Sequence, residues 1–371
     1  MLAQMVKAKG KRQKAKIGSA TIFAFCLLTF AFAACSSRPT DMRSLVPAET
    51  LVYLETNDLA AAMQPIIDSK PFTEAAKSKP DLAALKGVQL AIVVTGFETS
   101  EEKINDEQSV GRVQPRFVAV ADTHAWNYQA VAFAEQKLGS FVEDNYDSET
   151  KLEKSDKHGG KYFAWTAEDG RKAFTLVIDS IIYFSNDESA IEKCLAVRRG
   201  EADSILKTNK IQPAEAKTLA SGYVSTDGVA QIAALIGVKF ANESKEDSDL
   251  QTAIVDVLPQ LIRNSITDIS WTSAKAEHGI EDSFVVQTTQ TRDDKSDEIL
   301  SEIADSIIEE IENTSADDLA EILSEKKSGS QTSGENKIYS KENRFTDSRV
   351  ERRTVSDFGF IGWLISQFRT D

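Results

Sequence analysis

The sequence contains little cysteine. Only Cys26, Cys35 and Cys194 occur in 371 residues. Cys26 lies inside an N-terminal apolar run that we expect to be removed, and Cys35 follows that run directly. If Cys35 is modified, Cys194 is left without a partner, so we predict no disulfide within the mature chain. Its stability must then come from packing, and Cys194 is expected to be a small buried apolar residue.

Histidine is equally scarce, which argues against most metal sites. His124, His158 and His278 are the three histidines, and no two have the spacing of helical metal ligands. The sequence contains neither H-E-x-x-H nor G-x-S-x-G. "HGGK", residues 158–161, lacks the first glycine of a phosphate-binding loop and is interpreted as a turn. We therefore predict no catalytic residue, no metal and no cofactor.

The N-terminus has the three-part pattern of a secretory signal peptide, residues 1–34. Six lysine and arginine side chains precede Ile17, and an uncharged apolar run then extends to Ala34. "FAAC", residues 32–35, resembles a bacterial lipobox, which implies a diacylglyceryl thioether on Cys35 and cleavage before it. Two alternatives remain, namely ordinary A-x-A cleavage after Ala33 and a retained anchor, since a spanning helix needs roughly 17–25 apolar residues.

The predicted location outside the cytoplasm and the net charge limit the possible partners. Removal of the six basic residues leaves 37 basic and 58 acidic side chains, a net charge of −21. Such a surface repels nucleic acid, so no nucleic-acid partner is expected. We expect the partner to be a lipid bilayer, reached through the N-terminal lipid, with envelope proteins as further partners. Ser36 stands where an aspartate would favour inner-membrane retention, so the lipobox resemblance implies an outer-membrane protein facing the periplasm.

The pattern after residue 35 predicts an α+β fold, a mainly antiparallel sheet with helices packed on one face. Four stretches run from a strand-like segment through a polar pair into a helical segment; they begin at Leu51, Arg116, Ile181 and Ser221. This recurrence suggests an acidic body over 35–324, with two similar halves near 35–205 and 206–324. The alternative is that strand-to-helix turns look alike in all mixed proteins.

Local signals predict two hairpins and one helix cap. Residues 167–170, "AEDG", and 278–282, "HGIED", each separate two strand-like runs, as hairpin turns do. "SNDE", residues 185–188, matches a capping box in which Ser185 and Glu188 satisfy each other's backbone donors.

The end of the chain changes in composition. Residues 325–343 are rich in Ser, Gly and charge and predict a flexible linker. A basic and aromatic segment follows at 344–371. Its candidate contact residues are Arg349, Arg352, Arg353, Phe358, Phe360 and Trp363. They suit either contact with a membrane interface or docking onto the acidic body.

Two stretches resemble an uncharacterised family of exported bacterial proteins, known as a domain of unknown function. They are "SLVPAETLVYLETNDL", residues 44–59, and "RRTVSDFGFIGWL", residues 352–364. The resemblance implies export and an α+β build, and it carries over no functional residue.

The sequence therefore predicts a membrane-anchored envelope lipoprotein with a binding or structural role and no catalytic centre that can be named. One alternative is a periplasmic carrier of a lipid or another apolar ligand, which would need a long apolar cavity. Another is a hydrolase whose active site is assembled from distant residues.

Overall fold

The computed structural model describes residues 40–105, 108–146, 148–211, 217–243, 259–260, 262–289, 309, 311, 313–324, 336–346 and 348–367. Cys35 and the signal-peptide prediction lie outside these ranges.

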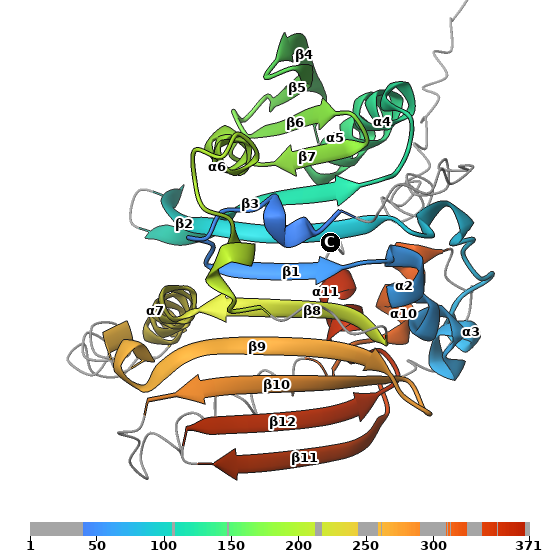
Figure 1. Ribbon diagram of the computed structural model, residues 1–371, viewed down its shortest axis with the longest axis vertical. Coiled ribbons are helices and arrows are strands. Elements are labelled where there is room, and N and C mark those ends of the chain that lie inside the picture. The colour runs from blue at the N-terminus through green and yellow to red at the C-terminus, as the bar shows by residue number, and fades with distance from the viewer. Residues whose placement is uncertain are drawn as a thin grey trace, which may run out of the picture.

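Twelve antiparallel strands form one open sheet (Figure 1). Its order is β11-β12-β10-β9-β8-β1-β2-β3-β7-β6-β5-β4. The strands are β1 Val52–Thr56, β2 Gln89–Asn105, β3 Gln108–Asp122, β4 Thr150–Lys157, β5 Gly160–Ala167, β6 Lys172–Ile178, β7 Ile181–Ser185, β8 Thr218–Ser225, β9 Ile266–Lys275, β10 Ile280–Thr288, β11 Ile338–Thr346 and β12 Arg349–Ser356. The predicted α+β class is confirmed.

Helices cover both faces of this sheet, so the expectation that they pack on one face alone is wrong. They are α2 Leu59–Asp68, α3 Lys70–Ala75, α4 Asn127–Phe133, α5 Gly139–Tyr146, α6 Glu188–Arg198, α7 Thr226–Glu243, α10 Ala316–Leu323 and α11 Gly359–Ser366. The structure also has short 3-10 helices, η1 Met42–Ser44, η2 Ala83–Leu85 and η4 Ile205–Thr208, and one π-helical segment, η3 Ala134–Leu138.

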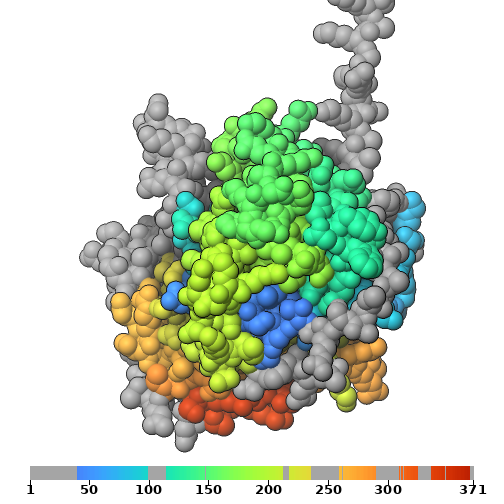
Figure 2. All heavy atoms as spheres, turned by 45° about the horizontal axis from the view of Figure 1, so that its top comes forward, coloured from blue at the N-terminus to red at the C-terminus, as the bar shows by residue number. Residues whose placement is uncertain are grey.

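Two adjacent residues of β1 belong to the two different main hydrophobic clusters. Tyr53 packs with η1, α6 and η4, whereas Leu54 packs with α2, α3, α10 and α11. Adjacent side chains of a strand point to opposite faces, so these clusters lie on opposite sides of the sheet. We call the sides the Tyr53 face and the Leu54 face. Figure 1 views the Tyr53 face, with α6 in front of the strands, and Figure 2 shows the molecule tilted so that the green segment with β4 comes toward the viewer.

The strand order repeats one connectivity on either side of the sheet centre. Outward from the centre it runs β1-β2-β3-β7-β6 in one direction and β8-β9-β10-β12-β11 in the other. Tyr53 of β1 pairs with Tyr223 of β8, and each is the tyrosine of its own strand-turn-helix unit. The second group of strands ends at Ser356, beyond the predicted limit of 324. The repeat is incomplete, because α6 and α11 follow equivalent strands yet lie on opposite faces.

The predicted boundaries near the C-terminus differ from the structure. Residues 338–343, assigned to the linker, form the first part of β11, and residues 349–366 add β12 and α11 to the body. β11 was missed because it is an edge strand with almost every residue exposed, so its sequence lacks the alternation of a half-buried strand.

The predicted hairpins are present, and the predicted capping box is wrong. β5 and β6 pair across the turn at 168–171, and β9 and β10 pair across 276–279. At α6 the N-cap is Asp187, whose side chain accepts a hydrogen bond from Ser189 N. Ser185 is fully buried and donates instead to the carbonyl of Phe117. The pairing of β7 with β3 thus determines the hydrogen-bond partner of Ser185.

Both outer strands of the sheet are exposed and charged. β4 carries Lys151, Glu153 and Lys154 along one edge, and β11 carries Lys341, Glu342 and Arg344 along the other. Charged side chains on an edge strand disfavour pairing with further strands.

Candidate functional site

The described chain begins at Thr40, five residues after Cys35, and Thr40 is fixed to the ends of two strands. Its backbone N–H donates to Gln89 Oε1 over 3.0 Å, and Gln89 Nε2 donates back to its carbonyl over 2.8 Å. Its hydroxyl donates to Asp122 Oδ2 over 2.5 Å. Gln89 and Asp122 are only 2% and 3% exposed. We call these three residues the Thr40 clamp.

Further donors hold Asp122 in place. Ser180 Oγ donates to Asp122 Oδ1 over 2.8 Å, and the backbone N–H of His124 donates to the same oxygen over 3.1 Å. The imidazole Nδ1 of His124 lies 3.5 Å from Asp122. A buried carboxylate needs such donors, because burial without them is costly. The clamp therefore sets a fixed exit point for the chain that leads to Cys35.

The three predicted arginines lie on β12 and divide between the two faces. Arg349 and Arg353 share the Tyr53 face with Glu351, which accepts from them over 3.1 Å and 2.7 Å. The Arg353 guanidinium lowers the pKa of Glu351. Arg352 is paired in register with Phe284 and occupies the other face. The spacing thus brings two of the three arginines together.

The predicted aromatic residues lie against the hydrophobic cluster of the Leu54 face. Phe358 is fully buried there. Phe360 meets Trp271 edge to face, with ring centroids 4.8 Å apart, and Trp363 stacks on Phe360 at 5.1 Å. In the structure this segment docks onto the body, which is one of the two arrangements that its sequence suits.

A buried carboxylate joins α11 to the sheet. Asp282 of β10 accepts from Trp271 Nε1 and from the backbone N–H of Phe360, each over 2.8 Å. The side chain is 2% exposed, and burial raises its pKa to about 6 despite these two donors. Gly359 has a φ of +58°, and a Cβ there would lie 2.7 Å from Asp282 Oδ2. Glycine thus allows the helix start to approach the carboxylate.

The remaining polar candidates do not converge. His158 and Gly159 have φ values of +52° and +77° and form the two-residue turn between β4 and β5, as predicted. His158 Nε2 lies 2.7 Å from Glu192 at the surface. Cys194 is fully buried, as predicted, and burial raises the pKa of its thiol to about 12. Within the described ranges no group of three His, Cys, Asp or Glu side chains could hold a metal ion.

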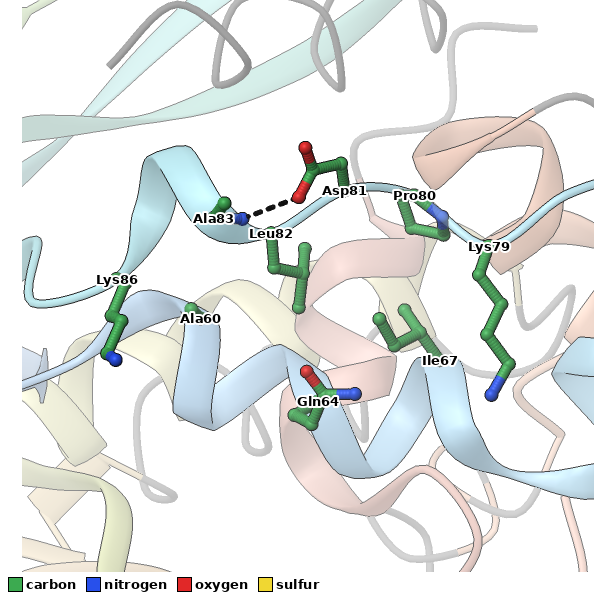
Figure 3. A pocket seen from close by; sticks show the side chains of 9 residues that line it. All are labelled: Ala60, Gln64, Ile67, Lys79, Pro80, Asp81, Leu82, Ala83 and Lys86. Atoms are coloured by element: carbon green, nitrogen blue, oxygen red, sulfur yellow. Dashed lines mark hydrogen bonds between the residues drawn. The ribbon is translucent and has the colours of Figure 1, made fainter. Parts of the chain in front are cut away.

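A groove lies between α2 and residues 79–86 (Figure 3). It measures about 340 Å³ and is lined by Ala60, Gln64, Ile67, Lys79, Pro80, Asp81, Leu82, Ala83 and Lys86. A second one, of about 390 Å³, is lined mostly by the polar turn around His158. Neither is the long apolar cavity that a lipid carrier needs. Among the helices that the structure describes, none is both long and apolar enough to cross a bilayer.

The sequence did not reveal the Thr40 clamp. Its members come from positions 40, 89 and 122, which only the sheet brings together. A local signal existed for part of it, since the polar residues Asp122 and Thr123 end a strand, but that pattern is shared by every strand-to-helix turn of the chain.

Comparison with known proteins gives distant structural likeness alone. No family model matches the chain, and no curated protein matches it. Crystal form III of TP0453 is similar with a TM-score of 0.41 and 11% identity, covering 90% of this chain and 100% of that chain. Crystal form IV gives 0.39 and 12%, covering 87% and 95%. Likeness at this level has no bearing on function.

Proposed function

We propose that this protein is a lipid-anchored protein of the bacterial cell envelope, attached through Cys35 to the outer membrane and facing the periplasm, with a binding or structural role. The Thr40 clamp is the observation that carries the proposal. The lipobox residue Cys35 lies five residues before a chain position that three hydrogen bonds to buried partners fix to the body. An anchor at Cys35 would therefore hold the body in a defined position beside the bilayer.

The bare part of the Tyr53 face is the surface we assign to binding. On β10 and β12 it presents Glu281, Ser283, Arg349, Glu351 and Arg353. Figure 1 shows no described helix in front of these strands. Ser283 and both arginines bond to Glu351, so these side chains are held in place before any partner arrives. A preordered polar surface loses less side-chain entropy on binding.

Metabolic labelling tests the anchor. Cells expressing the full chain with a radioactive fatty acid should yield a labelled protein that floats with membranes. The Cys35→Ala variant should be unlabelled, and the Ser36→Ala variant, changed at the next residue, should label like the wild type. Equal labelling of the wild type and Cys35→Ala would contradict the anchor.

Co-purification tests the role of the body. The detergent-extracted protein should retain envelope proteins that mass spectrometry detects and that an Arg349→Ala, Arg353→Ala double variant releases. Lys151→Ala, on the opposite edge of the sheet, serves as the control. Stoichiometric lipid in place of protein would favour the carrier alternative.

A further inference from the structure

Two large aromatic side chains stand out from the surface at the start of α4. Trp126 is 66% exposed and Tyr128 is 69% exposed. Trp165 and Trp271, by comparison, are 2% and 5% exposed. Tryptophan is strongly buried on average in soluble proteins. An exposed Trp and Tyr two residues apart therefore indicate a surface that meets something apolar.

The backbone that carries these rings is held rigidly. Ala125 is buried against Ala84, and its N–H donates to the hydroxyl of Thr123 over 3.2 Å. That hydroxyl donates in turn to the carbonyl of Ser180 over 2.9 Å. The N–H of Trp126 donates to Gln129 Oε1 over 3.2 Å. The rings thus project from a fixed turn.

This turn adjoins the Thr40 clamp. Asp122 accepts from Thr40 on one oxygen and from the His124 backbone on the other, and Trp126 follows His124 by two residues. Trp126 lies four positions after Asp122, so their Cα atoms are at most about 14 Å apart. The aromatic pair and the exit point of the N-terminal chain lie at the same end of β3.

The short connection between Cys35 and Thr40 limits how far this end of the sheet can lie from a lipid on Cys35. Five residues, even fully extended, reach at most about 18 Å. A lipid on Cys35 would therefore hold the end of the sheet that carries Trp126 and Tyr128 close to the headgroups. Tryptophan and tyrosine are the residues enriched at that depth of a membrane. Since the mature chain has a net charge of −21, contact through aromatic rings suits it better than contact through charge.

We propose that Trp126 and Tyr128 enter the headgroup region of the bilayer and, together with the lipid on Cys35, set the orientation of the body. This inference rests on the proposed anchor. The exposed side chains of Trp126 and Tyr128 then contact the same membrane to which the protein is attached.

Fluorescence quenching by bromine-labelled lipid tests the inference on the full lipidated protein. The protein is reconstituted in phosphatidylcholine vesicles with bromine near the top of the acyl chain. We expect quenching of the wild type, and a quenched fraction at least about twofold lower in Trp126→Phe, because Trp165 and Trp271 are buried in hydrophobic clusters and Trp363 stacks on Phe360. Trp363→Phe is the matched control and should quench like the wild type.

A second variant guards against misfolding. In the background Trp126→Phe, the change Tyr128→Trp moves the reporter by two residues and should restore quenching. Equal quenching in the wild type and Trp126→Phe, with both proteins floating with vesicles, would overturn the orientation and leave the anchor intact. Failure of the wild type to label and float would instead contradict the anchor itself.

Discussion

At the residue scale, Asp282 combines two roles that oppose each other. It accepts one hydrogen bond from the first turn of α11 and a second from Trp271 of β9, and it does so while almost completely buried. Donors favour the charged carboxylate, whereas burial favours the neutral acid. Burial dominates, since the pKa of Asp282 rises from 3.8 to about 6.

This raised pKa predicts a pH dependence of stability. The folded state binds the proton more tightly than the unfolded chain, so the contribution of Asp282 is fully present below pH 3.8 and is lost as the pH rises to about 6. The loss is on the order of 3 kcal/mol. In urea unfolding at pH 4 and pH 7, we expect the stability of the wild type relative to Asp282→Asn to fall by most of that amount between pH 4 and pH 7, because asparagine does not titrate. A gap independent of pH would contradict the assignment.

Phe358 provides a second prediction for a single residue. It is fully buried under α11, so Phe358→Ala should lower the free energy of unfolding by about 3–5 kcal/mol. Phe345 of β11 is 56% exposed, and Phe345→Ala should change it by no more than about 0.5 kcal/mol. Thermal denaturation of both variants measures the difference, and similar losses would mean that the C-terminal segment does not pack on the body.

At the element scale, sequence reasoning succeeded where one short stretch determines the structure. The turns at 167–170, 278–282 and 158–159 need glycine at a positive φ, and Gly170, Gly279 and Gly159 supply it. Reasoning failed where a distant strand decides the outcome. Ser185 has the right spacing for a cap, but the neighbouring strand β3 provides its carbonyl partner.

The C-terminal elements show a different limit. An aromatic segment that follows an arginine cluster has the same composition whether it enters a membrane or fills a groove in a protein. Which of the two occurs depends on Trp271, Phe284 and Leu319, which provide apolar surface from elsewhere in the chain. The Thr40 clamp could not be predicted from the sequence either, because its three members lie up to 82 positions apart.

At the scale of the whole molecule, the two groups of strands share one hydrophobic cluster. The cluster of the Leu54 face joins Ile66 and Phe72, from the first group, to Leu319 and Phe358, from the second. Pairing of β1 with β8 makes the sheet continuous across the same boundary. Neither group can separate without exposing apolar surface of the other.

We therefore expect a single cooperative unfolding transition. Differential scanning calorimetry of the body should give equal calorimetric and van't Hoff enthalpies. A fragment that ends at residue 205 should lack cooperative unfolding, because it loses β8, α10 and α11. Two resolved transitions, or a fragment that unfolds cooperatively, would show that the repeated strand order reflects two independent domains.

If the proposed anchor holds the protein on a membrane, the charged outer strands have a further effect. Copies that share one leaflet diffuse in two dimensions and meet far more often than they would in free solution. Unprotected outer strands would then join neighbouring copies into a ribbon of growing length. Lysine, glutamate and arginine along β4 and β11 oppose such growth, so the anchored protein would tolerate a high surface density without joining edge to edge.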